Sequence, residues 1–287
     1  MVLYSENSKV RLDGKTAIVT GCNTGIGKET VRDLYKRGCY VIMACRNTEK
    51  AEEAAKDIID SCKDIENVGK LVVEELDLNS LKSVKKFCNK ILEKHDTINL
   101  LINNAGIFAC PYGRTEDGFE TQFGTNHLAH FCLTLLLIPK IIKSAPSRIV
   151  TVTVNYQNIN IVSLQYGGFE YNEFKVLKRR TLDNNRKISC CPFWLFCGQR
   201  YLKQSYPKII TCAYDKIVKC FFKTPVEGAQ TTIYCAIDEK AGEESGLYYV
   251  TRKPTRPSSN AEDMEIAEKL WNVSLKLVGL EDYNFKQ

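Results

Sequence analysis

The stretch Thr20-Gly21-Cys22-Asn23-Thr24-Gly25-Ile26-Gly27 decides the fold of this chain. It follows the short apolar run 16–20, which is typical of a buried strand, and it opens a segment with helical periodicity, residues 27–37. A glycine-rich turn between a strand and a helix is typical of phosphate-binding sites, because the start of the helix offers unpaired N–H groups and a partial positive charge. The stretch therefore predicts a nucleotide site at the amino-terminal end of the chain.

Each of the three glycines has a separate expected role. Gly21 allows the tight turn, Gly25 lets the backbone approach a pyrophosphate, and Gly27 lets the helix pack closely on the strand. Because the turn lies inside a strand–helix–strand unit, we predict that it binds a dinucleotide. The candidate contacts in the turn are Gly21, Asn23, Thr24, Gly25, Ile26 and Gly27.

Apolar runs alternate with amphipathic segments through the first 150 residues. Strands are expected at 16–20, 39–44, 70–76, 98–102 and 148–154, and helices at 27–37, 49–61, 80–94 and 118–142. Strands that alternate with helices imply a parallel sheet. We therefore predict the α/β class, with a Rossmann-type doubly wound parallel sheet covered by helices on both faces.

Residues 155–220 interrupt this pattern with mixed polar, aromatic and cysteine residues that show no clear periodicity. Within them, the short apolar run 209–213 is the expected sixth strand. Order returns with helices at 227–237 and 261–277 and a strand at 247–250. We predict a single domain, residues 1–287, composed of a cofactor-binding half (11–154), a divergent segment (155–220) and a C-terminal part (221–280).

The end of the second predicted strand indicates which dinucleotide is bound. An acidic residue there hydrogen-bonds the ribose 2′-hydroxyl of NAD, whereas an arginine accommodates the 2′-phosphate of NADP. This chain has Ala44-Cys45-Arg46-Asn47 and no acid. Arg46 therefore predicts NADP(H) as the cofactor.

Composition and charge exclude several other functions. The net charge is only +6, and the densest basic run is 178–180, so we expect no nucleic-acid partner. The 13 cysteines are odd in number and include no CxxC pair, which indicates reduced thiols in the cytoplasm. His95, His127 and His130 lack zinc-ligand spacing to a cysteine pair, so no metal site is predicted.

We expect no membrane-spanning segment. Residues 1–13 are polar, without a signal-peptide core, and the longest apolar run, 131–142, is interrupted by Thr134, Pro139 and Lys140. Peripheral contact with an organelle membrane and assembly into a homo-oligomer stay open.

These motifs resemble the short-chain dehydrogenase/reductase family, and within it the retinol dehydrogenases. The resemblance includes the TGxxxGxG spacing, Asp77 after the third strand, Asn103-Asn104-Ala105-Gly106, and Asn126 in Thr125-Asn126-His127-Leu128. Lys223-Thr224-Pro225 and Ala267-Glu268-Lys269-Leu270-Trp271 resemble the retinol dehydrogenase subgroup.

The resemblance assigns expected roles to these residues. It implies that Asp77 meets the adenine ring, that Asn104, Ala105 and Gly106 border the cofactor, and that Asn126 helps to hold a proton-relay water. It also implies a small hydrophobic alcohol or carbonyl as the substrate, retinoid-like or otherwise.

The family's catalytic serine, tyrosine and lysine are matched less well. The family's serine position holds Val154, and the only YxxxK in the region is Tyr171 to Lys175. On a helix these two residues share a face, so Tyr171 and Lys175 are the candidate proton donor and its activating cation. In a second register, the catalytic tyrosine and lysine positions hold Leu177 and Thr181. The proline-glycine loop expected before residue 224 is also missing.

Three interpretations therefore stay open. The first is an NADP(H)-dependent oxidoreductase that acts on a hydrophobic alcohol or carbonyl. The second is a catalytically impaired relative that binds NADP(H) or a partner protein. The third is a mispredicted coding sequence of an active enzyme, with a frameshift or splice error in residues 155–220.

Overall fold

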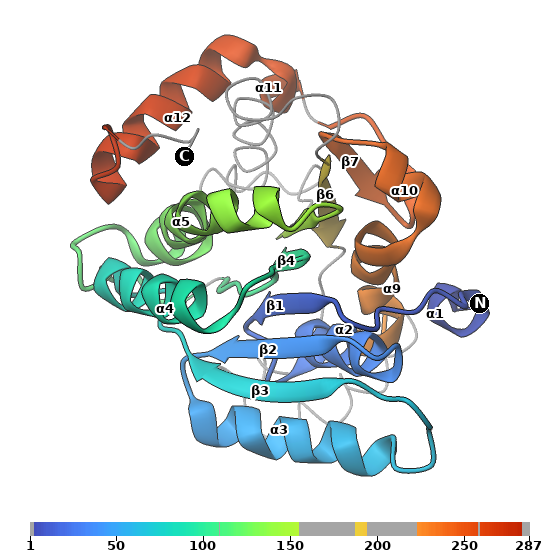
Figure 1. The fold of residues 1–287 in the computed structure, drawn as a ribbon. Coiled ribbons are helices and arrows are strands. Elements are labelled where there is room, and N and C mark those ends of the chain that lie inside the picture. The colour runs from blue at the N-terminus through green and yellow to red at the C-terminus, as the bar shows by residue number, and fades with distance from the viewer. Residues whose placement is uncertain (1–2, 109, 155–186, 194–222, 258, 283–287) are drawn as a thin grey trace, which may run out of the picture.

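The computed structural model of the protein describes residues 3–108, 110–154, 187–193, 223–257 and 259–282. In these residues, strands form one sheet in the order β3-β2-β1-β4-β5-β6-β7-β8 (Figure 1). All neighbouring strands are parallel except β7 and β8. The strands are β1 (Thr16–Thr20), β2 (Tyr40–Cys45), β3 (Lys70–Glu75), β4 (Leu100–Asn103), β5 (Arg148–Val154), β6 (Lys187–Phe193), β7 (Leu247–Val250) and β8 (Lys253–Pro254).

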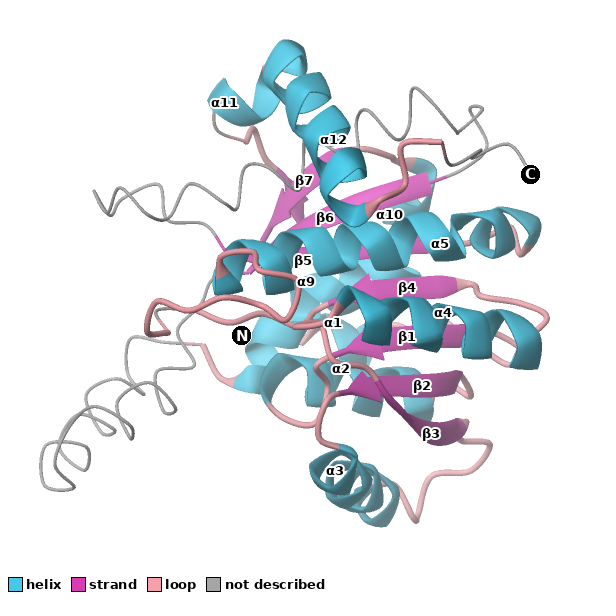
Figure 2. Ribbon diagram, turned by 90° about the vertical axis from the view of Figure 1, so that its left-hand side faces the viewer, coloured by secondary structure: helices cyan, strands magenta, loops and turns pink. Residues whose placement is uncertain are grey.

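Helices cover both faces of the sheet (Figure 2). The first face is covered by α4 (Leu81–Lys94), the π-helical turn η1 (Phe123–Leu128), α5 (Ala129–Lys143) and α12 (Met264–Val278). The second face is covered by α2 (Gly25–Lys36), α3 (Thr48–Ser61) and α9 (Pro225–Ile237). The short helices α1 (Tyr4–Asn7), α10 (Glu239–Glu243) and α11 (Ser259–Glu262) lie at the periphery. This arrangement confirms the predicted α/β class and doubly wound sheet.

Side-chain alternation along β1 divides the core into two layers. Ile18 joins the cluster beneath α4 and α5, whereas Ala17 and Val19 join the cluster beneath α2 and α9. All three side chains are fully buried. A strand in the centre of a parallel sheet is buried on both faces, which explains why this run is continuously apolar.

Local sequence sets where several helices begin and end. The side chain of Asn47 accepts a hydrogen bond from the N–H of Lys50 and caps α3. Thr224 and Glu227 form a capping box at the start of α9. Gly38, which follows α2, has φ +88°, a conformation that favours glycine.

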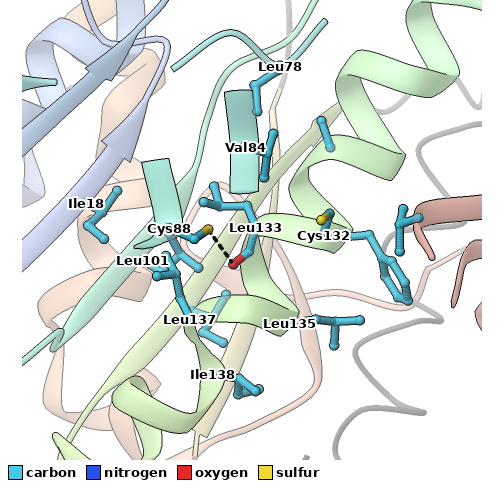
Figure 3. Packing of buried hydrophobic residues seen from close by; sticks show 14 of the residues in the cluster. Ile18, Leu78, Val84, Cys88, Leu101, Cys132, Leu133, Leu135, Leu137 and Ile138 are labelled. Carbon is cyan, nitrogen blue, oxygen red and sulfur yellow. Dashed lines mark hydrogen bonds between the residues drawn. The ribbon is translucent and has the colours of Figure 1, made fainter. Parts of the chain in front are cut away.

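The longest apolar helix is a core helix in this fold. In the described residues, Phe123–Lys143 is the helical stretch long and apolar enough to cross a membrane. Of the 18-residue apolar window within it, 67% is buried inside the protein. Figure 3 shows Leu133 and Leu137 of α5 packed near Val84 and Cys88 of α4. Packing against α4 and the sheet accounts for the apolar character of this helix.

The structure corrects two expected helices and adds a strand that was not predicted. The position beside β5 is taken by Lys187–Phe193, whose register with β5 runs from Arg148↔Lys187 to Val154↔Phe193. The predicted sixth strand, 209–213, lies outside the described residues. The predicted helix 118–142 begins instead at Phe123, with a π-helical turn. The predicted helix 261–277 is two helices, because Asp263 caps a new helix at Met264.

Candidate functional site

A pocket of about 870 Å³ lies at the carboxyl ends of β1, β2, β3 and β4. β1 lies between β2 and β4, so the order of strands reverses at β1. Ligands of open α/β sheets bind in the crevice at such a point. The lining residues are Gly21, Asn23, Thr24, Ile26, Gly27, Ala44, Cys45, Arg46, Asn47, Lys50, Leu76, Asp77, Leu78, Asn79, Asn104, Ala105, Gly106, Ile107, Thr121 and Thr125.

At two positions of the turn, Gly21 and Gly27, close packing leaves no room for a side chain. A Cβ on Gly21 would lie 2.7 Å from the Cα of Ala105, and one on Gly27 would lie 2.4 Å from Nδ2 of Asn104. Gly25 differs, because a Cβ there would have no atom within 4 Å. Gly21 and Gly25 both have φ +61°. The turn is therefore anchored on one side, and Gly25 faces open space.

The start of α2 is free to bind an anion. Its N-cap residue, Thr24, makes no side-chain capping hydrogen bond, and its first turn contains no acidic residue. The first N–H groups of a helix need partners, and the helix dipole gives this end a partial positive charge. Because these N–H groups adjoin the open space at Gly25, the site fits the pyrophosphate of a dinucleotide.

Two cationic side chains line the pocket beyond β2. Arg46 directly follows β2 and is exposed, and Lys50 lies in the first turn of α3. Among the described residues that line the pocket, Asp77 is the only acid. It lies beyond the end of β3, where its Oδ1 accepts a hydrogen bond of 2.9 Å from the N–H of Asn79. Lys50 was not among the residues predicted from the sequence, although its position in the first turn of the helix after β2 is a usable signal.

Thr20, the last residue of β1, holds the loop after β4 against the glycine turn. Its Oγ1 accepts hydrogen bonds of 2.9 Å from the backbone N–H groups of both Asn104 and Ala105. The side-chain amide of Asn104 in turn donates to the carbonyl oxygens of Thr20 and Gly21 at 2.9 and 3.2 Å. These contacts bring Asn104, Ala105 and Gly106 to the pocket wall, where the resemblance places them.

His130 completes this network from α5. Its Nε2 lies 2.9 Å from Thr20 Oγ1, and its Nδ1 lies 2.9 Å from the carbonyl oxygen of Asn126. The Thr20 hydroxyl already accepts two N–H groups, so its proton goes to Nε2, and Nδ1 of His130 then carries a proton that it donates to Asn126. Burial lowers the pKa of His130 to about 4, which keeps the ring neutral. Sequence reasoning identified neither Thr20 nor His130 as a site residue.

The side chain of Asn126 holds the backbone of the loop that follows β4. Its Oδ1 accepts from the N–H of Ile107 at 2.9 Å, and its Nδ2 donates to the carbonyl oxygen of Ile107 at 2.8 Å. Asn126 lies in η1, and such π-helical turns occur frequently at functional sites. It borders the pocket through Ile107 and is not itself a lining residue. Its role in holding a relay water stays a prediction.

The proposed catalytic pair is not placed by this structure. Tyr171 and Lys175 lie outside the described residues, as do the alternative positions Leu177 and Thr181. Val154, at the family's serine position, ends β5. On the same strand, the side chain of Thr153 is buried.

The comparisons with known proteins agree with this geometry. A family model described as short chain dehydrogenase matches residues 15–166. Retinol dehydrogenase 14 of Homo sapiens is 38% identical over an alignment of 294 positions, which covers 94% of this chain and 88% of that protein. Retinol dehydrogenase 13 of Homo sapiens is also 38% identical, over 96% of this chain and 87% of that protein.

A solved structure agrees along almost its whole length. It is the crystal structure of an uncharacterized protein from Mycobacterium Paratuberculosis, which is 28% identical to this chain. The match covers 97% of this chain and 98% of that one, with a TM-score of 0.70.

Proposed function

This chain belongs to the short-chain dehydrogenase family, and from that premise we propose that it is an NADP(H)-dependent oxidoreductase of hydrophobic alcohols or carbonyls. Members of this family use a nicotinamide dinucleotide. The observation that carries the proposal is the pocket itself, in which a glycine turn, an uncapped helix start and two cations converge at the carboxyl ends of the strands.

The preference for NADP(H) rests on charge at the ends of β2 and β3. Arg46 and Lys50 supply positive charge where the 2′-phosphate of the adenosine ribose would lie. Among the described residues that line the pocket, no acid follows β2 to accept a hydrogen bond from the ribose hydroxyl, and Asp77 follows the neighbouring strand β3. A phosphate carries more negative charge than a hydroxyl, so these two cations favour the phosphorylated nucleotide.

The proposed chemistry divides between the cofactor and the chain. A bound nicotinamide supplies or accepts the hydride. We assign the accompanying proton to the hydroxyl of Tyr171, which exchanges it with the substrate oxygen. If the two residues lie on a helix, they share a face, and the positive charge of Lys175 would lower the pKa of the tyrosine hydroxyl.

A hydrophobic substrate is supported by the relatives, which are named retinol dehydrogenases. A retinoid-like alcohol or aldehyde is therefore the first substrate class to test. A cytoplasmic location is part of the proposal, and it is supported by the odd number of cysteines and the absence of a CxxC pair in the sequence.

A second candidate function is cofactor binding without catalysis. It is favoured by Val154 at the position where the family has its catalytic serine, because a valine side chain cannot hydrogen-bond a substrate carbonyl. In the register that places Leu177 and Thr181 at the tyrosine and lysine positions, the chain would have no proton donor either.

One experiment separates the two candidates. The full chain is titrated with NADPH, and NADPH oxidation is then followed with retinaldehyde and with short aliphatic aldehydes. Turnover that Tyr171→Phe abolishes while NADPH still binds supports the oxidoreductase. Binding without turnover supports the second candidate, and a chain that does not bind NADPH contradicts both.

A further inference from the structure

Two thiols meet at the wall of the pocket. Cys22 lies in the glycine turn and Cys45 is the last residue of β2, and their Sγ atoms are 3.7 Å apart. The backbones run side by side here, because Thr20 pairs with Ala44 and the N–H of Gly21 donates to the carbonyl oxygen of Ala44 at 2.9 Å.

The two sulfurs differ in character. The thiol of Cys22 lowers the pKa of Cys45, as do the backbone N–H groups of Cys22, Asn23 and Gly21. Burial raises the pKa of Cys22, whose Sγ also donates to the carbonyl oxygen of Val19 at 3.2 Å. Cys45 is therefore the better nucleophile, and Cys22 is the thiol that stays protonated beside it.

Its place in the pocket distinguishes Cys45 from the other described cysteines, because it is the one that lines the pocket. Its side chain is only 3% exposed, and a small oxidant would reach it from the space that a dinucleotide would fill. Cys39 directly precedes the same strand, is not among the pocket-lining residues, and donates a hydrogen bond to the carbonyl oxygen of Lys15 at 3.3 Å. Burial raises the pKa of Cys39 to about 12. Cys39 is therefore a matched control for Cys45.

We propose that Cys22 and Cys45 form a redox-responsive site at which a peroxide produces a disulfide that closes the cofactor pocket. The thiolate of Cys45 attacks one peroxide oxygen, the O–O bond breaks, and a sulfenic acid forms as hydroxide leaves. The sulfur of Cys22 then attacks the sulfenic sulfur, the S–S bond forms, and the hydroxyl leaves as water with the thiol proton. In sum, two thiols and one hydrogen peroxide give one disulfide and two waters.

A disulfide between Cys22 and Cys45 would weaken cofactor binding because the glycine turn is tightly packed. The two sulfurs must approach by less than about 2 Å to reach the S–S bond length of about 2.05 Å. The backbones of Cys22 and Gly27 are in close contact, since even a Cβ added to Gly27 would lie 2.8 Å from the Cα of Cys22. The turn therefore has little room for that movement. The disulfide therefore displaces the backbone of the turn and the start of α2. This consequence rests on the proposed cofactor function, whereas formation of the disulfide does not.

The test uses the reduced full chain, treated with hydrogen peroxide with and without saturating NADP⁺, then alkylated and digested with trypsin. Cleavage places Cys22 in peptide 16–28 and Cys45 with Cys39 in peptide 38–46. Fragmentation, together with a Cys39→Ala variant, shows which sulfur is linked. We expect a link between Cys22 and Cys45 that dithiothreitol reverses and NADP⁺ suppresses. No link, or a link through Cys39, overturns the proposal.

A second measurement compares NADPH affinity before and after peroxide for each protein separately. We expect oxidation to weaken binding about tenfold or more in the unaltered chain and in Cys39→Ala. We expect no change in Cys22→Ala or Cys45→Ala, each compared with its own untreated form, with melting temperatures checking that each folds. A disulfide that leaves affinity unchanged overturns the closing of the pocket. If the reduced chain binds no NADPH, the proposed function fails while the peptide result still decides on the disulfide.

Discussion

The hydroxyl of Thr20 lies 2.9 Å from Nε2 of His130, a residue 110 positions later in the chain. This contact joins the end of β1 to α5. Each of the two residues also makes hydrogen bonds to residues at or beside the pocket. Thr20 holds the backbone of Asn104 and Ala105, and His130 holds the carbonyl oxygen of Asn126. The cofactor turn and the π-helical turn are therefore parts of one buried polar network.

We expect Thr20→Val to destabilise the fold by about 3 kcal/mol or more, because it leaves the N–H groups of Asn104 and Ala105 and the Nε2 of His130 without their partner. Each buried polar group that loses its partner costs about 1–3 kcal/mol. Thr20→Ser keeps the hydroxyl and should cost about 1 kcal/mol. Urea unfolding measures both variants. Equal losses in the two variants would show that the hydroxyl network contributes little.

We expect stability to fall on acidification because of His130. Its pKa is about 4 in the folded chain and about 6.5 when unfolded, so between these values only the unfolded chain binds the proton. The contribution of neutral His130 to the free energy of unfolding is complete above pH 6.5 and declines toward pH 4. The free energy of unfolding should fall by about 2 kcal/mol between pH 7 and pH 5.

Denaturant unfolding across this pH range provides the measurement, and His130→Gln is the reference because it does not titrate there. The pH slope of the variant should be shallower than that of the unaltered chain. Parallel slopes would mean that His130 is protonated in the folded state.

Gly25→Ala and Gly27→Ala should separate cofactor binding from folding. An alanine at Gly27 meets Asn104 and the backbone of Cys22, so we expect a large loss of stability, about 2 kcal/mol or more. An alanine at Gly25 meets no atom and pays only for its positive φ, about 1–2 kcal/mol.

The methyl group that Gly25→Ala adds, however, occupies the space in which a pyrophosphate would approach. We therefore expect Gly25→Ala to remain folded and to lose NADPH affinity by about tenfold or more. Thermal unfolding and NADPH titration of both variants provide the comparison. Unchanged affinity in a folded Gly25→Ala protein would place the pyrophosphate elsewhere.

Arg46→Asp should move cofactor preference from NADPH toward NADH. Loss of one charge-assisted contact with the 2′-phosphate is worth about 1.5–3 kcal/mol, or about 10- to 100-fold in affinity. Lys253→Asp makes the same change of charge on β8, at the opposite end of the sheet from β2, and serves as the control. Titration of both variants with NADPH and NADH measures the ratio. A preference that shifts equally in both variants would reflect net charge and not a contact of Arg46.

Much of the fold could be predicted because its signals are local. The strands at 16–20, 148–154 and 247–250 were predicted with the bounds that the structure has. Apolar runs, caps and glycine stops act over a few residues, so they can be recognised without the tertiary structure. The predicted cofactor residues other than Gly25 line one pocket for a related reason, since parallel strands bring their carboxyl ends to the same edge of the sheet.

Only the tertiary structure decided which strand pairs with β5 and which residues contact Thr20 and Cys22. Lys187–Phe193, which was not predicted as a strand, pairs with β5 because strand pairing depends on which segment the sheet brings into register. His130 reaches Thr20, and Cys45 reaches Cys22, through helix packing and strand order that no local pattern encodes. The sequence by itself therefore determined the elements and the phosphate-binding turn. The long-range contacts that hold the turn in place arise only when distant segments pack together.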